Sequence, residues 1–405
     1  MLISNLRLRL RDLGAKPCHE DRLLRGWSQA ASYDNKHSPA EIFFPLAMRR
    51  ELPAIEAELH GLARLHAEHP ADEGVARLLV ELHDGQMVES VLLPRGGLCV
   101  STQVGCAVGC VFCMSGRAGL IRQLGSAEIV AQVVLARRRR AVSKVVFMGM
   151  GEPAHNLDNV LEAIQLLGTH GNIGHKNLVL STVGDLRVFE RLMTGLKQAS
   201  SPIPPLTPPL KGGECSGLPA FLPPLQGEGW VSNDLAGVVG QPSQMASSFF
   251  SGDGVSPGYE QSRLNASVKP ALALSLHTTD AALRAKLLPR APQIPIEELV
   301  ERAEAYARAT GYPVQYQWTL IEGVNDSDAE VARIAQLLTG KYAVMNFIPF
   351  NAVDGLDYRR PSVERIAAMV QTLKRHGILA KVRDSAGQEI EGACGQLRAR
   401  AEKAK

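Results

Sequence analysis

Three closely spaced cysteines are the most informative chemical feature of the sequence. Cys106, Cys110 and Cys113 form a C-x3-C-x2-C run. Three thiolates on one loop can bind three irons of a [4Fe–4S] cluster and leave the fourth iron open. A structural zinc ion takes four ligands, and no further His or Cys follows at short spacing. The spacing therefore favours an iron–sulfur cluster over two alternatives, a zinc site and buried structural cysteines.

Other polar residues follow the ends of the strands that the sequence predicts. In the segment Gly149-Met-Gly-Glu-Pro153, glycine permits a close backbone approach, and the Glu152 carboxylate can accept a hydrogen bond from an amino group. Alone, this segment is better explained as a Gly-rich turn. Four more residues occupy strand ends, where α/β barrels build their sites, although each alone fits an ordinary hydrogen-bonded side chain. They are Ser181, Ser275, His277 and Asn351.

The elements that must position these residues alternate along the chain. From Cys99 onward, apolar β-rich runs alternate with amphipathic segments, which predicts parallel strands with right-handed helical crossovers and an open or complete α/β barrel. The expected strands are 99–104, 144–149, 177–182, 271–277, 314–321, 343–349 and 378–384, and the expected helices lie near 126–139, 157–168, 185–199, 295–310, 326–339 and 362–376.

Two smaller elements precede the barrel, and one segment interrupts it. The first residues show helical spacing, and an Asp-Gly pair at 84–85 between two β-rich runs predicts a hairpin. A later segment rich in Pro, Gly and Ser predicts a flexible insertion that cannot bury a core. We therefore divide the chain into 1–70 (helical), 71–95 (hairpin) and 96–400 (barrel core), with 200–267 as the insertion.

The composition is that of an ordinary globular protein. Hydrophobic residues make up 45% and charged residues 21% of the 405-residue chain, which excludes a wholly disordered chain. The net charge of +3 is too small to indicate a partner, so RNA binding would depend on local basic patches. The sequence has no apolar run long enough to span a membrane, and its N-terminus lacks the apolar core of a secretory signal. We expect a cytoplasmic protein without membrane contact.

The cysteine run and its surroundings are similar to a known family. A C-x3-C-x2-C run after the first strand of an α/β barrel is the signature of the radical S-adenosylmethionine (SAM) superfamily. Within it, the chain resembles the RlmN/Cfr family of RNA adenine methyltransferases from about residue 12 to 400. The resemblance rests on six segments in order: Cys99-Val-Ser-Thr-Gln-Val-Gly-Cys106, Val146-Phe-Met-Gly-Met-Gly-Glu-Pro153, Leu180-Ser-Thr182, Leu274-Ser-Leu-His277, Asn346-Phe-Ile-Pro-Phe-Asn351 and Gly392-Ala-Cys-Gly-Gln-Leu397.

The resemblance implies a fold and two cofactors. The fold is a partial (β/α)6-type radical SAM barrel, of the α/β class, with a small N-terminal helical accessory domain and a β-hairpin. The cofactors are a [4Fe–4S] cluster, held by Cys106, Cys110 and Cys113, and SAM, whose amino and carboxylate groups the open iron chelates. The residues that match SAM-binding positions are Gly151, Glu152, Ser181, Ser275, Leu276, His277 and Asn351.

The resemblance also implies three catalytic residues. Cys394 matches the cysteine that takes a methyl group from a first SAM as S-methylcysteine, and a radical from a second SAM then abstracts hydrogen from that methyl group. Carbon 2 of adenine is electrophilic, so a methylene radical can add to it where polar methyl transfer cannot. Cys99 matches the thiol that releases the adduct through a transient disulfide with Cys394. Glu89 matches the proton-accepting base, although alone it would be interpreted as an exposed strand carboxylate.

RNA is the partner that the resemblance implies. The substrate would be 23S ribosomal RNA or transfer RNA, with carbon 8 of adenine as the alternative target, and the enzyme would be a monomer served by a flavodoxin- or ferredoxin-type electron donor. Arg137–Arg140 either contacts RNA or complements a helix end. A second basic group resembles part of the family's accessory RNA-binding domain: Arg7, Arg9, Arg11, Lys16, Arg22 and Arg25.

Two other classes of function remain open from the sequence. One is a radical SAM activase or maturase that acts on a protein. Such enzymes generally lack a pair equivalent to Cys99 and Cys394, so the presence of both favours RNA methylation. The other is a relative that binds RNA without catalysis, and retention of all five matched cysteines argues against it.

Overall fold

A computed structural model provides the fold. It describes residues 1–34, 37–199, 267–351 and 356–383. The predicted insertion, apart from its last residue, lies outside the described residues, as do two of the cysteines, Cys215 and Cys394.

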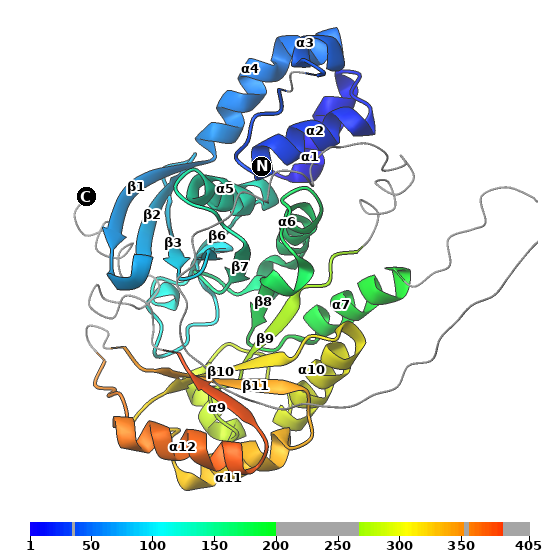
Figure 1. Ribbon diagram of the computed structural model, residues 1–405. Helices are drawn as coiled ribbons and strands as arrows, with labels where there is room; N and C mark the ends of the chain where they lie inside the picture. Colours follow the sequence, from blue (N-terminus) through cyan, green and yellow to red (C-terminus); the bar gives the residue numbers. More distant parts are fainter. Residues whose placement is uncertain (35–36, 200–266, 352–355, 384–405) are drawn as a thin grey trace, which may run out of the picture. The chain divides into compact units, whose positions relative to one another are not determined.

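One large sheet organises the described residues (Figure 1). Neighbouring strands are antiparallel from β1 to β4 and parallel from β4 to β12, and within the described residues β1 and β12 form its two edges. In spatial order the strands are β1 (Ala63–Pro70), β2 (Ala76–Leu82), β3 (Met87–Leu93), β4 (Gly97–Cys99), β7 (Lys144–Phe147), β8 (Leu178–Thr182), β9 (Ala271–Ser275), β10 (Val314–Leu320), β11 (Ala343–Pro349) and β12 (Leu379–Val382).

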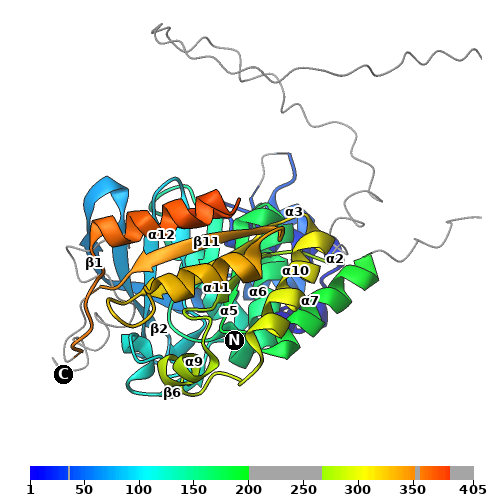
Figure 2. The same ribbon diagram turned by 90° about the horizontal axis from the view of Figure 1, so that it is seen from below.

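Helices cover one face of this sheet, which we call the outer face. Side chains alternate between the two faces of a strand, so Trp318 of β10 and Phe347 of β11 both enter the main apolar core on this face. Figure 2 shows α12, α11, α10 and α7 in a row beside the strands. The covering helices are α5 (Ser126–Arg137), α6 (Leu157–Thr169), α7 (Leu186–Ala199), α10 (Ile296–Thr310), α11 (Asp328–Leu338) and α12 (Val363–Arg375).

The opposite face, which we call the inner face, carries a smaller core. Cys99 of β4, Val146 of β7, Val179 of β8 and Ala273 of β9 form this separate cluster. Parallel strands end at one edge of a sheet, and α/β barrels place their sites at that carboxyl edge. The predicted α/β barrel architecture is thus confirmed, with the sheet open within the described residues.

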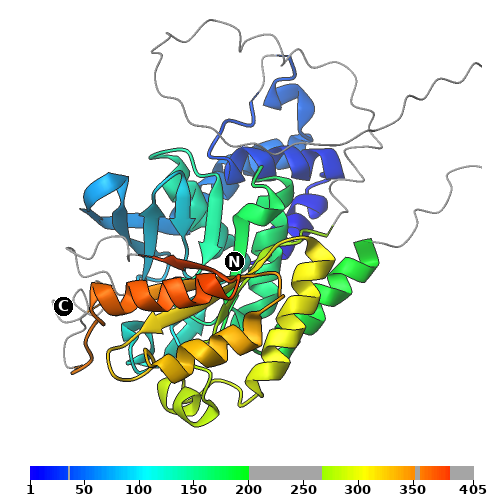
Figure 3. The same ribbon diagram turned by 60° about the horizontal axis from the view of Figure 1, so that its bottom comes forward.

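The N-terminal residues form four helices, drawn in blue in Figure 3. The second of them contacts α5 and α6, and the fourth contacts α5. Ile3 N donates to Ser126 Oγ (2.9 Å) and Ser4 N donates to Glu162 Oε1 (2.7 Å), which attaches the first helix to α5 and α6. No helix in the described ranges is both long and apolar enough to cross a membrane. The four helices are α1 (Ile3–Asp12), α2 (Pro17–Ser28), α3 (Ala40–Phe43) and α4 (Leu46–Gly61).

The structure departs from the predicted elements in three places. Residues Ala63–Pro70, predicted to be helical, form β1, because exposure alternates along this segment as it does in a strand paired on one side. The predicted strand 99–104 divides: β4 ends at Cys99, and β5 (Gln103–Gly105) pairs with β6 (Leu120–Gln123) in a separate sheet. Helix α9 (Ala281–Leu287) was not predicted.

Candidate active site

The three cysteines of the C-x3-C-x2-C run lie on one loop, between β5 and a short 3-10 helix. Val111 N donates to Leu287 O at the end of α9 (3.0 Å), and Arg290 Nη1 donates to Ala107 O (3.0 Å). The unpredicted helix α9 and the residues after it therefore hold the cluster loop in place.

The surroundings of the three thiols fit a metal cluster. Burial raises the pKa of Cys106 to about 11, and it also raises the pKa values of Cys110 and Cys113. Repulsion among the three sulfurs adds to this effect, whereas the backbone N–H of Gly109 favours the Cys106 thiolate and the hydroxyl of Ser115 favours the Cys113 thiolate. Buried thiolates aided by such donors lack only a positive charge, which iron would supply.

The spacing of potential ligands also bears on the zinc alternative. Across the described part of the chain, no three His, Cys, Asp or Glu side chains converge as ligands of a single metal ion do. In a cubane each cysteine binds its own iron, so its ligands stand farther apart than those of a single ion. The iron–sulfur interpretation therefore stays a prediction from the spacing of the cysteines.

The Gly149–Pro153 segment lies against the chain that joins β4 to β5. A Cβ atom on Gly149 would lie 2.7 Å from Val100 O, and one on Gly151 would lie 2.6 Å from Gln103 Cγ. Gly151 also has a φ of +106°, which glycine adopts without strain. In the described structure, the close approach that these glycines allow is to the chain itself.

Glu152 is fixed at the edge between β7 and β8. Its Oε1 accepts from Ala154 N and its Oε2 accepts from Val183 N, both at 3.1 Å. Burial raises its pKa to about 7, whereas these N–H groups and the Thr182 hydroxyl lower it. These three donors leave one of the four lone pairs of the carboxylate, so Glu152 can still accept one hydrogen bond from a ligand.

His277 links β9 to the cluster loop. Its Nδ1 accepts from Thr319 N (3.0 Å), and its ring meets that of Phe112, between two of the cysteines, edge-on with 4.8 Å between centroids. Burial, with the charge of Arg284, lowers the pKa of His277 to about 3. The ring is therefore neutral near pH 7 and carries its proton on Nε2. Its φ of +64° is unusual for a residue other than glycine.

The remaining predicted SAM-binding residues lie at the same edge. Ser181 is in β8, Ser275 ends β9, and Asn351 lies two residues beyond the end of β11. Leu276 points its side chain into the main core, so only its backbone can serve a ligand. The structure thus brings Glu152 and His277 next to the cluster loop and places the other residues at the carboxyl ends of their strands.

Two residues that support this edge were missed in the sequence. Asn325 is fully buried, and its Nδ2 donates to the backbone oxygens of His277 and Thr319, each at 2.7 Å. Glu330 accepts from Thr279 N (2.9 Å) just after His277. Both hold the chain after β9 in position. An Asn-Asp pair after a strand was the available signal for Asn325.

Cys99 and Glu89 lie together on the inner face. Cys99 pairs in register with Val91, two residues after Glu89 on β3. Glu89 is buried, not exposed as its sequence alone suggested, and its Oε2 lies 2.5 Å from Arg77 Nη2. Burial raises the pKa of Cys99 to about 12, an effect that the positive charges of Arg77 and Arg383 oppose. Cys394, their predicted partner, lies outside the described residues.

Most arginines of the N-terminal basic group form internal contacts. Arg7 and Arg11 both pair with the buried carboxylate of Glu20, at 2.9 and 2.7 Å, and Arg9 pairs with Glu58 at 2.7 Å. These guanidinium groups therefore stabilise the helical region. Lys16 lies at the start of α2, where its backbone N donates to His19 Nδ1 (3.0 Å).

The Arg137–Arg140 run also makes structural contacts. Arg137 donates to Ser28 O (2.6 Å) and Gly171 O (2.7 Å), and Arg140 donates to Gly74 O (2.6 Å). These side chains satisfy backbone carbonyls around the end of α5. Arg137 and Arg140 therefore tie neighbouring segments of the fold to the end of α5, and neither interpretation made from the sequence describes these contacts.

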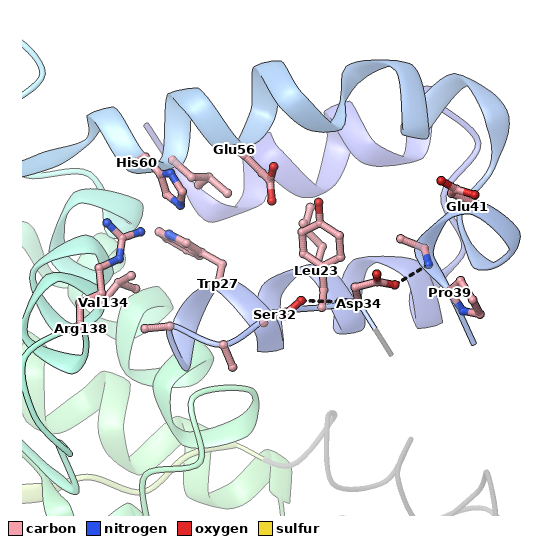
Figure 4. A pocket seen from close by; sticks show the side chains of 16 residues that line it. Leu23, Trp27, Ser32, Asp34, Pro39, Glu41, Glu56, His60, Val134 and Arg138 are labelled. Atoms are coloured by element: carbon pink, nitrogen blue, oxygen red, sulfur yellow. Dashed lines mark hydrogen bonds between the residues drawn. The ribbon is translucent and has the colours of Figure 1, made fainter. Parts of the chain in front are cut away.

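A cavity of about 740 Å³ lies in the helical region (Figure 4). Residues from α2 and α4 line it together with Arg138, which follows α5, and Figure 4 shows Trp27, His60 and Arg138 close together at one end. None of the predicted SAM-binding or catalytic residues lines this cavity. The cavity is thus separate from the carboxyl edge.

Comparison with known proteins shows the family of the chain. Residues 100–206 match the Radical SAM superfamily. Probable RNA methyltransferases of Azoarcus sp. (strain BH72) and Leptothrix cholodnii are 58% and 57% identical, each over 99% of this chain and 95% of the relative. A solved radical SAM methyltransferase from Sphaerobacter thermophilus has a TM-score of 0.68 and 29% identity over 98% of this chain and 97% of that one. The chain therefore belongs to the family of these RNA methyltransferases within the radical SAM superfamily.

Proposed function

We propose that this protein is a radical SAM methyltransferase that methylates carbon 2 of an adenine in 23S ribosomal RNA. One observation carries the proposal: the cluster loop, Glu152 and His277 meet at the carboxyl edge, and Cys99 and Glu89 lie on the inner face of the same sheet. Membership of the family supports the reaction class. The names of the relatives support RNA as the substrate class, and the resemblance supplies the target carbon and the choice of 23S ribosomal RNA.

The residues of the edge would hold the two cofactors. Cys106, Cys110 and Cys113 would bind the cluster, which with SAM supplies one-electron chemistry and the methyl group. Glu152 would accept a hydrogen bond from the SAM amino group through its remaining lone pair. His277, neutral because it is buried, would donate from Nε2. The burial of these groups keeps water from the reacting atoms.

The two thiols would act in succession on the RNA. Cys394 would carry the methyl group as a thioether. This methyl group would lose a hydrogen atom to the SAM-derived radical and bond through the remaining methylene to carbon 2 of the adenine, and the adduct would give back the one electron that the electron donor supplied. Glu89 would accept the proton that leaves carbon 2. The Cys99 thiolate would then attack the Cys394 sulfur: an S–S bond forms, the S–C bond breaks, and the released carbon keeps the electron pair and takes up a proton. An external dithiol reductant would return both cysteines to thiols.

The charges around Cys99 support its role. Burial keeps Cys99 a thiol at neutral pH, and the groups that favour its thiolate are the backbone N–H of Met148 and the positive charges of Arg77 and Arg383. Arg77 also pairs with Glu89, the residue that would accept the proton from carbon 2. One guanidinium thus serves both groups.

The oligomeric state, the location and the electron donor of this protein are proposed from its resemblance to the family. We propose a cytoplasmic monomer, reduced by a flavodoxin- or ferredoxin-type donor. Since most N-terminal arginines are engaged internally, RNA contacts of the helical region would come from its remaining groups, Lys16 among them.

Mass spectrometry of RNA nucleosides tests the proposal. RNA from a deletion strain would be compared with RNA from the strain complemented with wild-type protein or with Cys106→Ala protein. We expect 2-methyladenosine only with the wild-type gene, at a site that maps to 23S ribosomal RNA. Appearance of 8-methyladenosine instead would move the target to carbon 8, and identical nucleosides in all three samples would refute RNA adenine methylation.

A further inference from the structure

Two amide side chains face one another across neighbouring strands of the inner face. Gln317 of β10 and Asn346 of β11 are partners in the parallel register, and Gln317 is also the partner of Ser275 in β9. Residues in register share a face, so both amides lie on the face of Ala273 and Ser275, opposite Trp318. Gln317 is 4% exposed and Asn346 is 2% exposed.

Each amide has a buried polar atom without a hydrogen-bond partner. Gln317 Oε1 and Asn346 Nδ2 are both unpartnered. Gln317 Nε2 donates to Gln315 O (3.2 Å), which fixes the amide so that its oxygen is the free atom. A buried polar atom left unpaired costs free energy, and most buried polar groups are paired. Two such atoms on adjacent side chains therefore indicate a ligand that pairs with both.

The position of the pair connects it with the carboxyl edge. The backbone oxygen of Gln317 accepts from Leu276 N (3.0 Å), one residue before His277. Ser275, the neighbour of Gln317 in the register, is itself among the residues predicted to bind SAM. A ligand bound to Gln317 and Asn346 would thus lie beside the carboxyl edge, where the reaction is proposed to take place.

The free atoms define the shape of the group that they can bind. Gln317 Oε1 can accept a hydrogen bond and Asn346 Nδ2 can donate one. A flat group that carries a donor next to an acceptor would pair with both. Adenine offers this edge as its N6 amino hydrogen and the adjacent ring nitrogen, and Gln and Asn amides are the side chains that bind adenine in this way. We propose that Gln317 Oε1 and Asn346 Nδ2 bind the N6 amino group and a neighbouring ring nitrogen of an adenine.

Two adenines fit this chemistry, and both depend on the proposed function. One is the base of SAM and the other is the target base of the RNA. Both reach the carboxyl edge in the proposed reaction, so the test must separate them by measuring SAM binding and RNA methylation independently.

The first measurement asks whether the amides serve the fold or a ligand. Gln317→Leu and Asn346→Leu remove the free polar atoms and keep similar volume. If these atoms have no partner within the fold, their removal costs no hydrogen bond. The melting temperature of the cluster-free protein then stays the same or rises in both variants. The matched control is Gln315→Leu, the same residue type on the same strand and face. A melting temperature that falls in both variants and not in the control would assign the pair to the fold and overturn the proposal.

The second measurement identifies the adenine. With cluster-loaded protein, the dissociation constant for SAM and the yield of 5′-deoxyadenosine without RNA are measured, followed by methyladenosine in RNA from a complemented deletion strain. Loss of a bidentate contact with adenine should change either the SAM dissociation constant or the methyladenosine yield about 10- to 100-fold. A weaker SAM complex assigns the pair to SAM. If the dissociation constant for SAM is unchanged and the RNA contains at least about tenfold less methyladenosine, Gln317 and Asn346 bind the target base.

The remaining outcomes are also decisive. Wild-type SAM affinity together with wild-type methylation in both variants would overturn the proposal. If the wild-type protein itself gives no methyladenosine, the proposed function fails, and the SAM arm alone then decides this inference: weaker SAM binding in both variants supports it, and unchanged binding overturns it.

Discussion

The outer and inner faces of β10 and β11 have opposite chemistry although they share one backbone. On the outer face, Trp318 and Phe347 are fully buried in the main apolar core, and Trp318 Nε1 donates to Asn325 O. On the inner face, Gln317 and Asn346 are nearly as buried, yet each has an unpaired polar atom. The outer face has one such atom, the Tyr316 hydroxyl of β10, whereas the inner face has an acceptor and a donor side by side on neighbouring strands, which is the arrangement that a ligand can pair with.

This difference separates stability from function within single strands. Apolar burial on the outer face contributes to the free energy of unfolding. The polar atoms of the inner face and the carboxyl edge cost free energy until ligands pair with them. Substitutions on the two faces should therefore produce different kinds of loss, and the following predictions proceed from the largest effect to the smallest.

Replacing one cluster cysteine should give the largest effect. In Cys106→Ala, we expect iron and sulfide content and SAM cleavage to fall to background, because two thiolates cannot hold the cluster firmly. The matched control is Cys18→Ala, which removes an exposed cysteine of α2 and should keep full iron content. Iron and absorption measurements on anaerobically purified protein check this, and normal iron in Cys106→Ala would contradict the assignment.

A substitution on the outer face should reduce stability. Phe347→Ala removes a fully buried ring from the main core, and we expect the free energy of unfolding to fall by about 3–5 kcal/mol. The control, Val363→Ala, lies on the exposed surface at the start of α12 and should change it by less than about 0.5 kcal/mol. Denaturant unfolding measures both. Equal small losses would show that the outer face is not the principal core.

A smaller and pH-dependent effect should come from His277. Its φ of +64° is tolerated by Asn and not by Ala, so His277→Ala should cost about 1–2 kcal/mol more than His277→Asn. The pKa of His277 is lowered from 6.5 to about 3, so below pH 6.5 the unfolded state binds a proton that the folded state does not. Wild-type stability is therefore lost as pH falls through this window.

Measuring the free energy of unfolding at several pH values separates the titration of His277 from the packing of its side chain. Relative to His277→Asn, the wild-type free energy of unfolding should fall by up to about 1.4 kcal/mol per pH unit between pH 6 and 4. Unfolding of both cluster-free proteins over this range measures the difference. Parallel pH profiles would show that the imidazole titrates alike in the folded and unfolded states.

The sequence predicted the elements with strong periodicity and missed those defined by tertiary contacts. The apolar runs of the parallel strands and the helices from α5 to α12, except α9, were predicted because their burial patterns are regular. β1 was missed since half of its residues are polar, and α9 since it is short, although Asp280 caps it by accepting from Leu283 N.

For the site, the sequence predicted the residues that carry the chemistry and missed the contacts that hold them in place. The cysteine run defined the cluster loop because its spacing has few other uses, and strand ends indicated Glu152 and His277. The internal pairing of Arg7 and Arg11 with Glu20 could not be predicted, because charge in a sequence does not reveal which carboxylate lies opposite. The unpaired atoms of the inner face likewise depend on the register between two strands.

The measurement that tests the two-thiol account most directly is the search for RNA attached to Cys99→Ala protein. Without the Cys99 thiolate, the enzyme should still methylate Cys394 and bond to RNA, and then stall because nothing attacks the thioether. Protein purified from cells should carry an RNase-resistant oligonucleotide as added mass on the Cys394 peptide, whereas Cys394→Ala should carry none. Wild-type turnover by Cys99→Ala without any adduct would contradict the account.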